Sequence, residues 1–311
     1  MKTKMLVAKF EDKGTSTLSS GMALMIIAML IIPGIDAIAK LLSDSIAAGQ
    51  VAWARFFFQV ILLAPFLGRY GLKLDRMLWM HAARGGLIAL STLIFFTALK
   101  TMPLANAIAI FFVQPFIVTL LAYAILGETF GWRRMLAIIF GFVGALLIIK
   151  PSYEAFGLIA LLPVATAFLF ALYAILTRWL LVNASDISAS PVSMQFLAGF
   201  FGMMTMSVAL VLGYVHEISF LTPTWPTAAQ WQLLALLGII GTSAHFLVVM
   251  AYARVSIAVL APFQYLEIVG ATVLGLMLFN EFPDLLTWLG IAIIVSSGIF
   301  VFFRERKLAR R

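Results

Sequence analysis

The sequence predicts an all-α integral membrane protein with ten transmembrane helices arranged as two inverted five-helix repeats. Composition is the first of three observations behind this prediction: 63% of the 311 residues are hydrophobic and only 11% are charged, whereas a soluble domain carries about 25% charged residues. The second is a series of apolar runs of about 20 residues, the length at which a helix crosses a bilayer. The third is a weak internal repeat, in which Glu128 and Glu281 close matching apolar runs.

The predicted spans follow from the apolar runs and from the glycine, proline and charged residues between them. A polar, basic tail (residues 1–20) comes first, without the separate apolar segment of a cleavable signal. The first repeat is expected over residues 21–150, the second over residues 156–303, and a basic tail over residues 304–311. The spans are predicted near residues 21–42, 47–67, 78–98, 103–126, 132–149, 156–179, 191–213, 231–252, 257–279 and 285–303.

The lysine and arginine residues predict how the chain is oriented. If the N-terminus lies inside, sixteen of them fall in or beside inner loops and tails, and only Lys100 and Lys150 fall outside. Because positively charged loops stay on the cytoplasmic side, we expect a multi-pass protein of the bacterial inner (cytoplasmic) membrane with both termini in the cytoplasm. The same residues account for the net charge of +8, so the expected surroundings are a lipid bilayer and no nucleic-acid partner is expected.

Residue types exclude or disfavour several chemistries. The chain has no cysteine, and this excludes disulfides, thiol nucleophiles and cysteine-bound zinc. Its three histidines lack the HExxH spacing of a zinc site. The segment "GTSAH" (241–245) lacks the second glycine of a nucleophile elbow. We therefore expect no metal, no cofactor and no enzymatic activity.

The internal repeat appears when the chain is aligned with itself at a shift of 153 residues. "ALKTMPLANAIAIFFVQPFIVTLLAYAILGE" (98–128) then lies over "AYARVSIAVLAPFQYLEIVGATVLGLMLFNE" (251–281), and Gln114 lies over Glu267. Since each half holds an odd number of predicted spans, the halves must face opposite ways across the membrane. Inverted repeats are typical of secondary transporters, whose substrate site lies near the midplane between the halves.

These segments resemble the EamA branch of the drug/metabolite transporter superfamily over nearly the whole chain. The resemblance also rests on "VAWARFFFQVILLAPF" and "GFVGALLIIKP" in the first half. The family pattern has an arginine in the second span and a proline and a glutamate in the fourth, and the glutamate recurs at the end of the ninth. Four residues match it: Arg55, Pro115, Glu128 and Glu281. "RFFF", "RGGL" and "FNEFPD" are most similar to the sub-branch of bacterial S-adenosylmethionine and riboflavin carriers. The resemblance implies a secondary transporter that moves a small polar metabolite by alternating access around a polar pocket at the midplane.

Polar side chains inside the predicted spans form the candidate site. A charged residue near the centre of a membrane helix costs roughly 2.5–3.5 kcal/mol and usually faces the interior of the bundle. Three cations (Lys40, Arg55 and Arg84) and two anions (Asp36 and Glu267) lie in the spans. This balance favours an anionic or zwitterionic substrate that is amino-acid-like or nucleoside- or cofactor-like. The candidate substrate-binding residues are Asp36, Arg55, Gln114, Tyr173, His245, Gln264, Tyr265 and Glu267.

Each charged residue also has a structural interpretation. Glu267 is a candidate to bind substrate or to carry a coupled proton, but it could instead pair with Arg55. Arg55 could clamp an anion through its planar guanidinium or hold helices together. Arg84 is expected to extend toward the lipid headgroups from the inner end of its span. Asp36 and Lys40, four residues apart, are expected to form a local ion pair.

Prolines predict where the spans are interrupted, because proline removes a backbone donor and clashes with the preceding turn. Breaks are expected at Pro33 and Gly34, at Pro115 and at Pro262. Since transporters commonly build substrate sites at interrupted helices, the centre of the ninth span is the first choice for the transport site. A passive facilitator or channel and a non-transporting scaffold are the alternative functions, and the protein could be a monomer or a homodimer.

Overall fold

The computed structural model describes residues 2–70, 78–126, 132–183, 191–255, 260 and 263–308. Every regular element within these ranges is a helix. The helices are α1 (Lys2–Leu42), α2 (Ala48–Tyr70), α3 (Leu78–Leu99), α4 (Leu104–Phe111), α5 (Gln114–Leu126), α6 (Trp132–Phe156), the 3₁₀ helix η1 (Gly157–Leu161), α7 (Leu162–Asn183), α8 (Pro191–Val215), α9 (Ala228–Arg254), α11 (Leu266–Phe279) and α12 (Leu285–Leu308).

Within the described ranges, six helical stretches are long and apolar enough to cross a membrane. They are Ser19–Leu42, Ala48–Leu67, Leu78–Leu99, Ile139–Leu180, Pro191–Val215 and Ala228–Arg254, and shorter apolar stretches cover Leu104–Val118, Leu266–Phe279 and Leu285–Ser297. Helix α1 already begins at Lys2, so residues expected as a polar tail belong to the same helix. The predicted all-helical membrane class is confirmed, whereas the count of ten spans and their inverted arrangement stay predictions.

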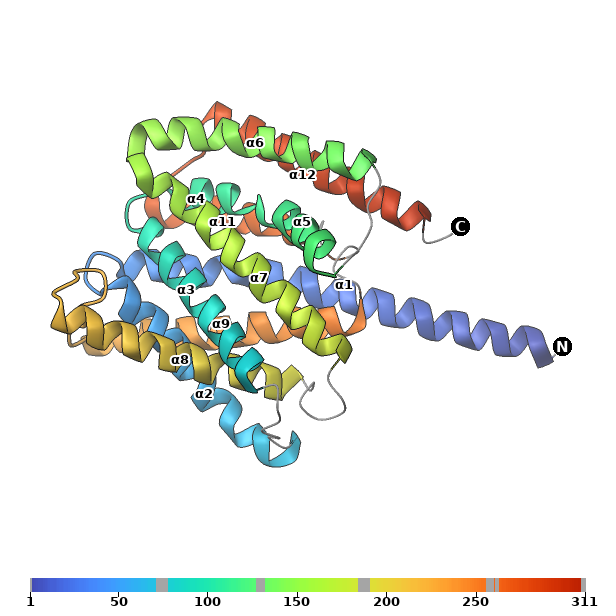
Figure 1. The fold of residues 1–311 in the computed structure, drawn as a ribbon, viewed down its shortest axis with the longest axis horizontal. Helices are drawn as coiled ribbons and strands as arrows, with labels where there is room; N and C mark the ends of the chain where they lie inside the picture. The colour runs from blue at the N-terminus through green and yellow to red at the C-terminus, as the bar shows by residue number, and fades with distance from the viewer. Residues whose placement is uncertain are drawn as a thin grey trace.

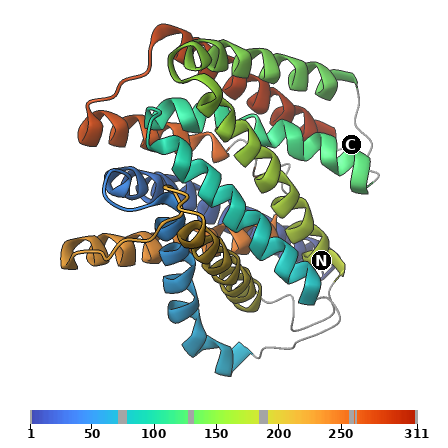
Figure 2. The same ribbon diagram turned by 60° about the vertical axis from the view of Figure 1, so that its left-hand side comes forward.

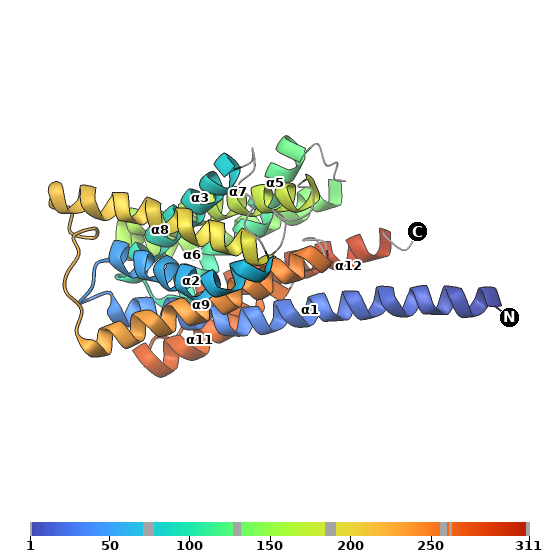
Figure 3. The ribbon, with the colours of Figure 1, turned by 90° about the horizontal axis from the view of Figure 1, so that it is seen from below.

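The helices are arranged as a bundle whose two ends can be distinguished. Figure 1 shows that α1 begins and α12 ends on the same side of the molecule, and the view from below agrees (Figure 3). The connections from α1 to α2 and from α8 to α9 lie at the opposite end (Figure 3). Following the orientation predicted from the sequence, we call the end at which α1 terminates the outer end, and the other the inner end. Between them, α3 and α7 lie side by side (Figure 2).

At the outer end, the connection from α8 to α9 is held against α2. Gln50 Nε2 donates to the carbonyl oxygen of Thr224 at 2.7 Å, and the N–H of Thr224 donates to Gln50 Oε1 at 2.9 Å. Thr227 then caps α9 in a capping box, in which the side chains of Thr227 and Gln230 each accept from the other's backbone N–H. This fixed start sets the position of α9, whose later turns carry His245.

Close packing of two helices depends on a pair of glycines, which is typical of membrane bundles. Helices α6 and α12 lie side by side along one edge of the molecule (Figures 1 and 2). A Cβ atom on Gly144 would lie 3.0 Å from the carbonyl oxygen of Gly290, and one on Gly290 would lie 2.6 Å from that of Gly144. The helix backbones therefore approach too closely for a side chain at either position.

The predicted break at Pro33 and Gly34 is wrong, because α1 runs through both residues without interruption. The ring of Pro33 packs against α11 at Gly270, where a Cβ atom would lie 2.8 Å from Pro33 Cγ. Proline removes one backbone donor from α1, but the glycine on the neighbouring helix leaves room for its ring. Pro33 therefore acts as a packing contact between α1 and α11.

Candidate functional site

A cavity of about 90 Å³ lies within the bundle, between α1, α2, α3, α4, α5, α7, α9 and α11. This volume accommodates several water molecules. Five phenylalanines supply much of its apolar wall: Phe95, Phe96, Phe111, Phe112 and Phe170. Its polar lining residues are Asp36, Arg55, Ser91, Thr92, Gln114, Thr166, His245, Tyr252, Gln264 and Glu267.

Arg55 projects from α2 and is held by neutral partners on two other helices. Its Nη1 donates to the hydroxyl of Thr92 on α3, and its Nη2 lies 2.6 Å from Nε2 of His245 on α9. Because a guanidinium can only donate hydrogen bonds, Nε2 of His245 must be the acceptor, so this histidine is neutral with its proton on Nδ1. Thr92 in turn donates to the carbonyl oxygen of Ile88 at 2.8 Å. These contacts fix the guanidinium at the cavity wall.

Two carboxylates line the same cavity from different helices. Asp36 lies on α1 and is 7% exposed, and Glu267 lies in the first turn of α11 and is 6% exposed. In the described part of the chain, neither carboxylate forms an ion pair with Arg55. A carboxylate in the first turn of a helix is favoured by the helix dipole, which helps to explain why Glu267 is tolerated in a buried position.

Two helix interruptions meet beside these carboxylates. The fourth predicted span is divided between α4, which ends at Phe111, and α5, which begins at Gln114 with Pro115 in its first turn. A turn at Tyr265 precedes α11. The rings of Phe112 and Tyr265, which correspond in the internal repeat, pack with their centroids 5.3 Å apart. The predicted break at Pro262 lies outside the described residues.

With the fold and the cavity defined, the chain can be compared with known proteins. The sequence matches the EamA-like transporter family over residues 19–150 and again over residues 156–303. The chain belongs to this family. The resemblance predicted from its motifs is thus confirmed, and the two family domains together with the apolar helices make it a multi-pass membrane protein.

Two relatives and one solved structure illustrate the match. The chain is 32% identical over 294 residues to an S-adenosylmethionine uptake transporter of Rickettsia bellii (strain RML369-C), and the alignment covers 94% of this chain and 96% of the relative. It is 29% identical over 266 residues to a riboflavin transporter of Rhizobium johnstonii, with 85% and 84% covered. One crystal structure superposes with a TM-score of 0.65 at 21% identity, covering 93% of this chain and 99% of the other. That last likeness shows a shared fold.

Most of the substrate-binding residues predicted from the sequence line the cavity. Six of the eight candidate substrate-binding residues line it: Asp36, Arg55, Gln114, His245, Gln264 and Glu267. Tyr173 and Tyr265 are not among its lining residues. The Tyr173 ring lies 5.2 Å from the guanidinium carbon of Arg84, and the Tyr265 ring packs on Phe112.

Arg84 does not extend toward the headgroups, so that prediction is wrong. Its residue exposure is 0%, its Nε donates to the hydroxyl of Thr177 at 2.9 Å, and its Nη1 donates to the carbonyl oxygen of Met194 at 3.2 Å. Arg84 thus finds polar partners on α7 and α8 inside the bundle, which makes extension to the membrane surface unnecessary.

Lys40 also has a partner other than the predicted one. Its ammonium pairs with Glu281, 2.8 Å away, and not with Asp36. Of the three cations in the predicted spans, only Arg55 therefore lines the cavity, where it faces two carboxylates. Among the lining residues that the structure describes, the positive excess expected from the sequence is therefore not found.

Sequence reasoning missed the aromatic wall and two hydroxyl groups. Tyr252 lines the cavity and accepts a hydrogen bond from Gln264 Nε2 at 3.0 Å, and Thr92 positions Arg55. The paired phenylalanines at 95–96 and 111–112 were the available signal, but with 27 phenylalanines in the chain such pairs are not distinctive.

Proposed function

We propose that this EamA-family protein is a secondary transporter that moves a small polar metabolite across the bacterial inner membrane. Its two five-helix repeats would face opposite ways and expose the central cavity alternately to each side, with both chain termini in the cytoplasm. One observation carries the proposal: the buried side chains of Arg55, Asp36 and Glu267 line a single cavity beside two helix interruptions. Such an arrangement is typical of midplane substrate sites in transporters.

The cavity chemistry favours a zwitterionic substrate that carries an aromatic ring. Arg55 has five N–H donors, and its described hydrogen bonds to Thr92 and His245 use two of them, which leaves donors for a carboxylate or phosphate. Asp36 and Glu267 would receive a cationic group. The surrounding phenylalanines can pack on a planar ring or around a cation. A purely anionic substrate, also expected from the sequence, is less well supported because two carboxylates line the wall.

The relatives named for S-adenosylmethionine and riboflavin uptake supply the first two solutes to compare. S-adenosylmethionine has an amino-acid zwitterion, a positively charged sulfonium and a planar purine. Riboflavin has a planar ring system but neither a carboxylate nor an ammonium group. The charges of the cavity therefore favour a compound of the first kind, built from a nucleoside and an amino acid.

A two-step experiment tests this function. Thermal unfolding of the purified protein would be measured with S-adenosylmethionine, riboflavin, adenosine, methionine and a dicarboxylate, because a ligand that binds only the folded state raises the unfolding temperature. Solutes that stabilise the protein would then be tested for counterflow in proteoliposomes. We expect saturable counterflow of a zwitterionic, ring-bearing solute. Flux without counterflow would indicate a channel, and transport of neutral solutes that survives Arg55→Ala would contradict the proposed site.

Glu267 is the proposed proton-coupling residue. The sequence holds no ATPase motif, so energy would come from a gradient, and Glu267 is a buried carboxyl group on the cavity wall. Glu267→Gln keeps the shape of the side chain but cannot carry a proton. We expect this variant to retain counterflow and to lose pH-driven accumulation, while the exposed-site control Glu154→Gln keeps both. Unchanged pH-driven accumulation in Glu267→Gln would argue against coupling through this residue.

A further inference from the structure

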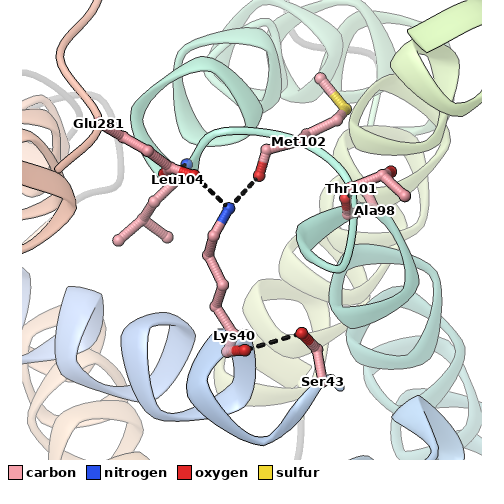
Figure 4. A network of polar contacts seen from close by, with 7 residues as sticks. All are labelled: Lys40, Ser43, Ala98, Thr101, Met102, Leu104 and Glu281. Atoms are coloured by element: carbon pink, nitrogen blue, oxygen red, sulfur yellow. Dashed lines mark hydrogen bonds and ion pairs between the residues drawn. The ribbon is translucent and has the colours of Figure 1, made fainter. Parts of the chain in front are cut away.

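Lys40 and Glu281 form a polar cluster at the outer end of the bundle. The Lys40 ammonium lies 2.8 Å from Glu281 Oε1 and donates to the carbonyl oxygen of Met102 at 2.5 Å. The other carboxylate oxygen, Oε2, accepts from the backbone N–H of Leu104 at 3.0 Å. Figure 4 shows the Lys40 side chain reaching from α1 toward the start of α4, where the Glu281 side chain meets it. The Phe279 ring lies 5.3 Å below the ammonium.

The cluster joins three elements that the repeat assigns to different halves. Lys40 lies near the end of α1, and Leu104 is the first residue of α4; both belong to the first half. Glu281 follows α11 and belongs to the second half. Asp36, which lines the cavity, lies four residues before Lys40, so the cluster sits about 6 Å further along α1 toward the outer end.

Both partners are specifically satisfied, and this distinguishes the cluster from an ordinary surface ion pair. The side chains of Lys40 and Glu281 are only 11% and 24% exposed. Glu281 also supplies an acceptor to the N-terminus of α4, where the backbone N–H groups lack partners within the helix and the dipole favours negative charge. Removing either side chain would therefore leave the other charge partly buried without its partner, which is costly.

We propose that Lys40 and Glu281 form an outer gate that closes one end of the transport path. The inference rests on the proposed alternating access: for the cavity to open at the outer end, Glu281 of the second half must separate from Lys40 and from the start of α4. Both halves contribute to the cluster, so it can form only while they are together at that end. In the orientation predicted from the positive-inside pattern, this end would face the periplasm.

A labelling experiment tests the gate without any knowledge of the substrate. The chain has no cysteine, so Ser91→Cys would place a single thiol on the cavity wall. Its reaction rate with a membrane-impermeant thiol reagent would be measured in right-side-out and inside-out vesicles. In the right-side-out vesicles we expect Lys40→Met and Glu281→Ala to raise the rate roughly fivefold, which corresponds to about 1 kcal/mol of lost closure energy. Glu281→Gln should have a smaller effect, because its amide oxygen can still accept from Leu104.

The controls are exposed charges predicted to lie on the same side. Lys100→Met and Glu154→Gln each remove a charge from an exposed residue and should leave the labelling rate unchanged. A melting curve for each variant would establish that it is folded. Unchanged rates in folded Lys40→Met and Glu281→Ala would overturn the gate, as would an increase confined to inside-out vesicles.

A second measurement separates the gate from the proposed function. In a Lys40→Cys, Glu281→Cys variant, a short reducible cross-linker joining the two thiols should abolish counterflow, and reduction should restore it. Full counterflow in the cross-linked protein would overturn the gate while leaving transport established. If no solute is transported by the unmodified protein, the proposed function fails, and the labelling rates still decide whether Lys40 and Glu281 close the cavity.

Discussion

The central cavity contains buried charges and the outer gate contains partly buried ones, and the two regions hold their charges in opposite ways. At the gate, Lys40 and Glu281 contact each other at 2.8 Å and direct their remaining hydrogen bonds to the backbone at the start of α4. In the cavity, Arg55 is held by the neutral groups of Thr92 and His245. The described contacts thus pair the charges of the gate directly with each other and leave Arg55 bound to neutral partners.

The difference separates charges that hold helices together from charges that remain available to a ligand. A partly buried ion pair whose hydrogen bonds are satisfied resists the removal of either partner, because the charge left behind loses its compensation. A buried charge that is held only by neutral groups keeps donors or acceptors for a bound solute. Its burial is costly without an opposite charge, so a solute of opposite charge stabilises it most. Substitutions at the gate should therefore change stability and opening, whereas substitutions in the cavity should change ligand affinity.

The sharpest test of this comparison is Arg55→Ala. Because truncating one partner of a buried, hydrogen-bonded charge pair costs about 2–5 kcal/mol, we expect ligand affinity to fall by about 100-fold. Ligand-dependent thermal unfolding and the KM of counterflow measure the change. The matched control is Arg254→Ala, at an exposed position on α9, which should bind ligand normally. Normal affinity in folded Arg55→Ala would remove the distinction between the two regions.

Arg84→Ala extends the comparison to a buried arginine that does not line the cavity. The substitution removes the hydrogen bonds to Thr177 and the Met194 carbonyl, together with the contact to the Tyr173 ring. We expect a loss of about 2 kcal/mol in unfolding free energy, with ligand affinity unchanged in the folded fraction. Thermal unfolding with and without ligand separates the two effects. Lost affinity at normal stability would instead assign Arg84 to the transport path.

Glu281→Ala should destabilise the protein less, because its side chain is partly exposed. We expect a loss of about 1 kcal/mol, or a fall of about 2 °C in the melting temperature for a chain of this size. Lys40→Met should have a similar effect, and the double variant should lose less than the sum of the two single losses because they share one interaction. Additive losses would mean that the ion pair makes no net contribution to the folded state.

The charged part of the cavity could be predicted from the sequence. An ionisable residue deep in an apolar span is energetically costly, so it usually faces the interior of the bundle or a cavity. Asp36, Arg55 and Glu267 all line the cavity for this reason. Aromatic residues give no such signal, since a phenylalanine fits equally well against lipid, another helix or a ligand. The apolar wall therefore emerges only from the packing of the helices.

The errors of the sequence reasoning arise from contacts between segments that are distant along the chain. Lys40 does not pair with Asp36, its neighbour on the helix, because the carboxylate of Glu281, 241 positions later, lies within reach of its long side chain. Pro33 leaves α1 unbroken because Gly270 of α11 makes room for its ring. Tyr173 packs on Arg84 because the rotation of α7 is set by its neighbours. Spacing along one helix specifies none of these partners.

The smallest expected effect belongs to Gln264, which lines the cavity and donates to the Tyr252 hydroxyl at 3.0 Å. A side-chain hydrogen bond between membrane helices contributes about 0.6 kcal/mol on average, so Gln264→Leu should weaken ligand affinity by roughly threefold. If Gln264 acts through Tyr252, then Tyr252→Phe should cause a similar loss, and the double variant should bind no more weakly than either single one. Gln232→Leu, at an exposed position of α9, is the control that should bind normally. A much larger loss in Gln264→Leu than in Tyr252→Phe would mean that the amide contacts the substrate directly. The cavity would then bind substrate through a neutral group as well as through the guanidinium and the two carboxylates.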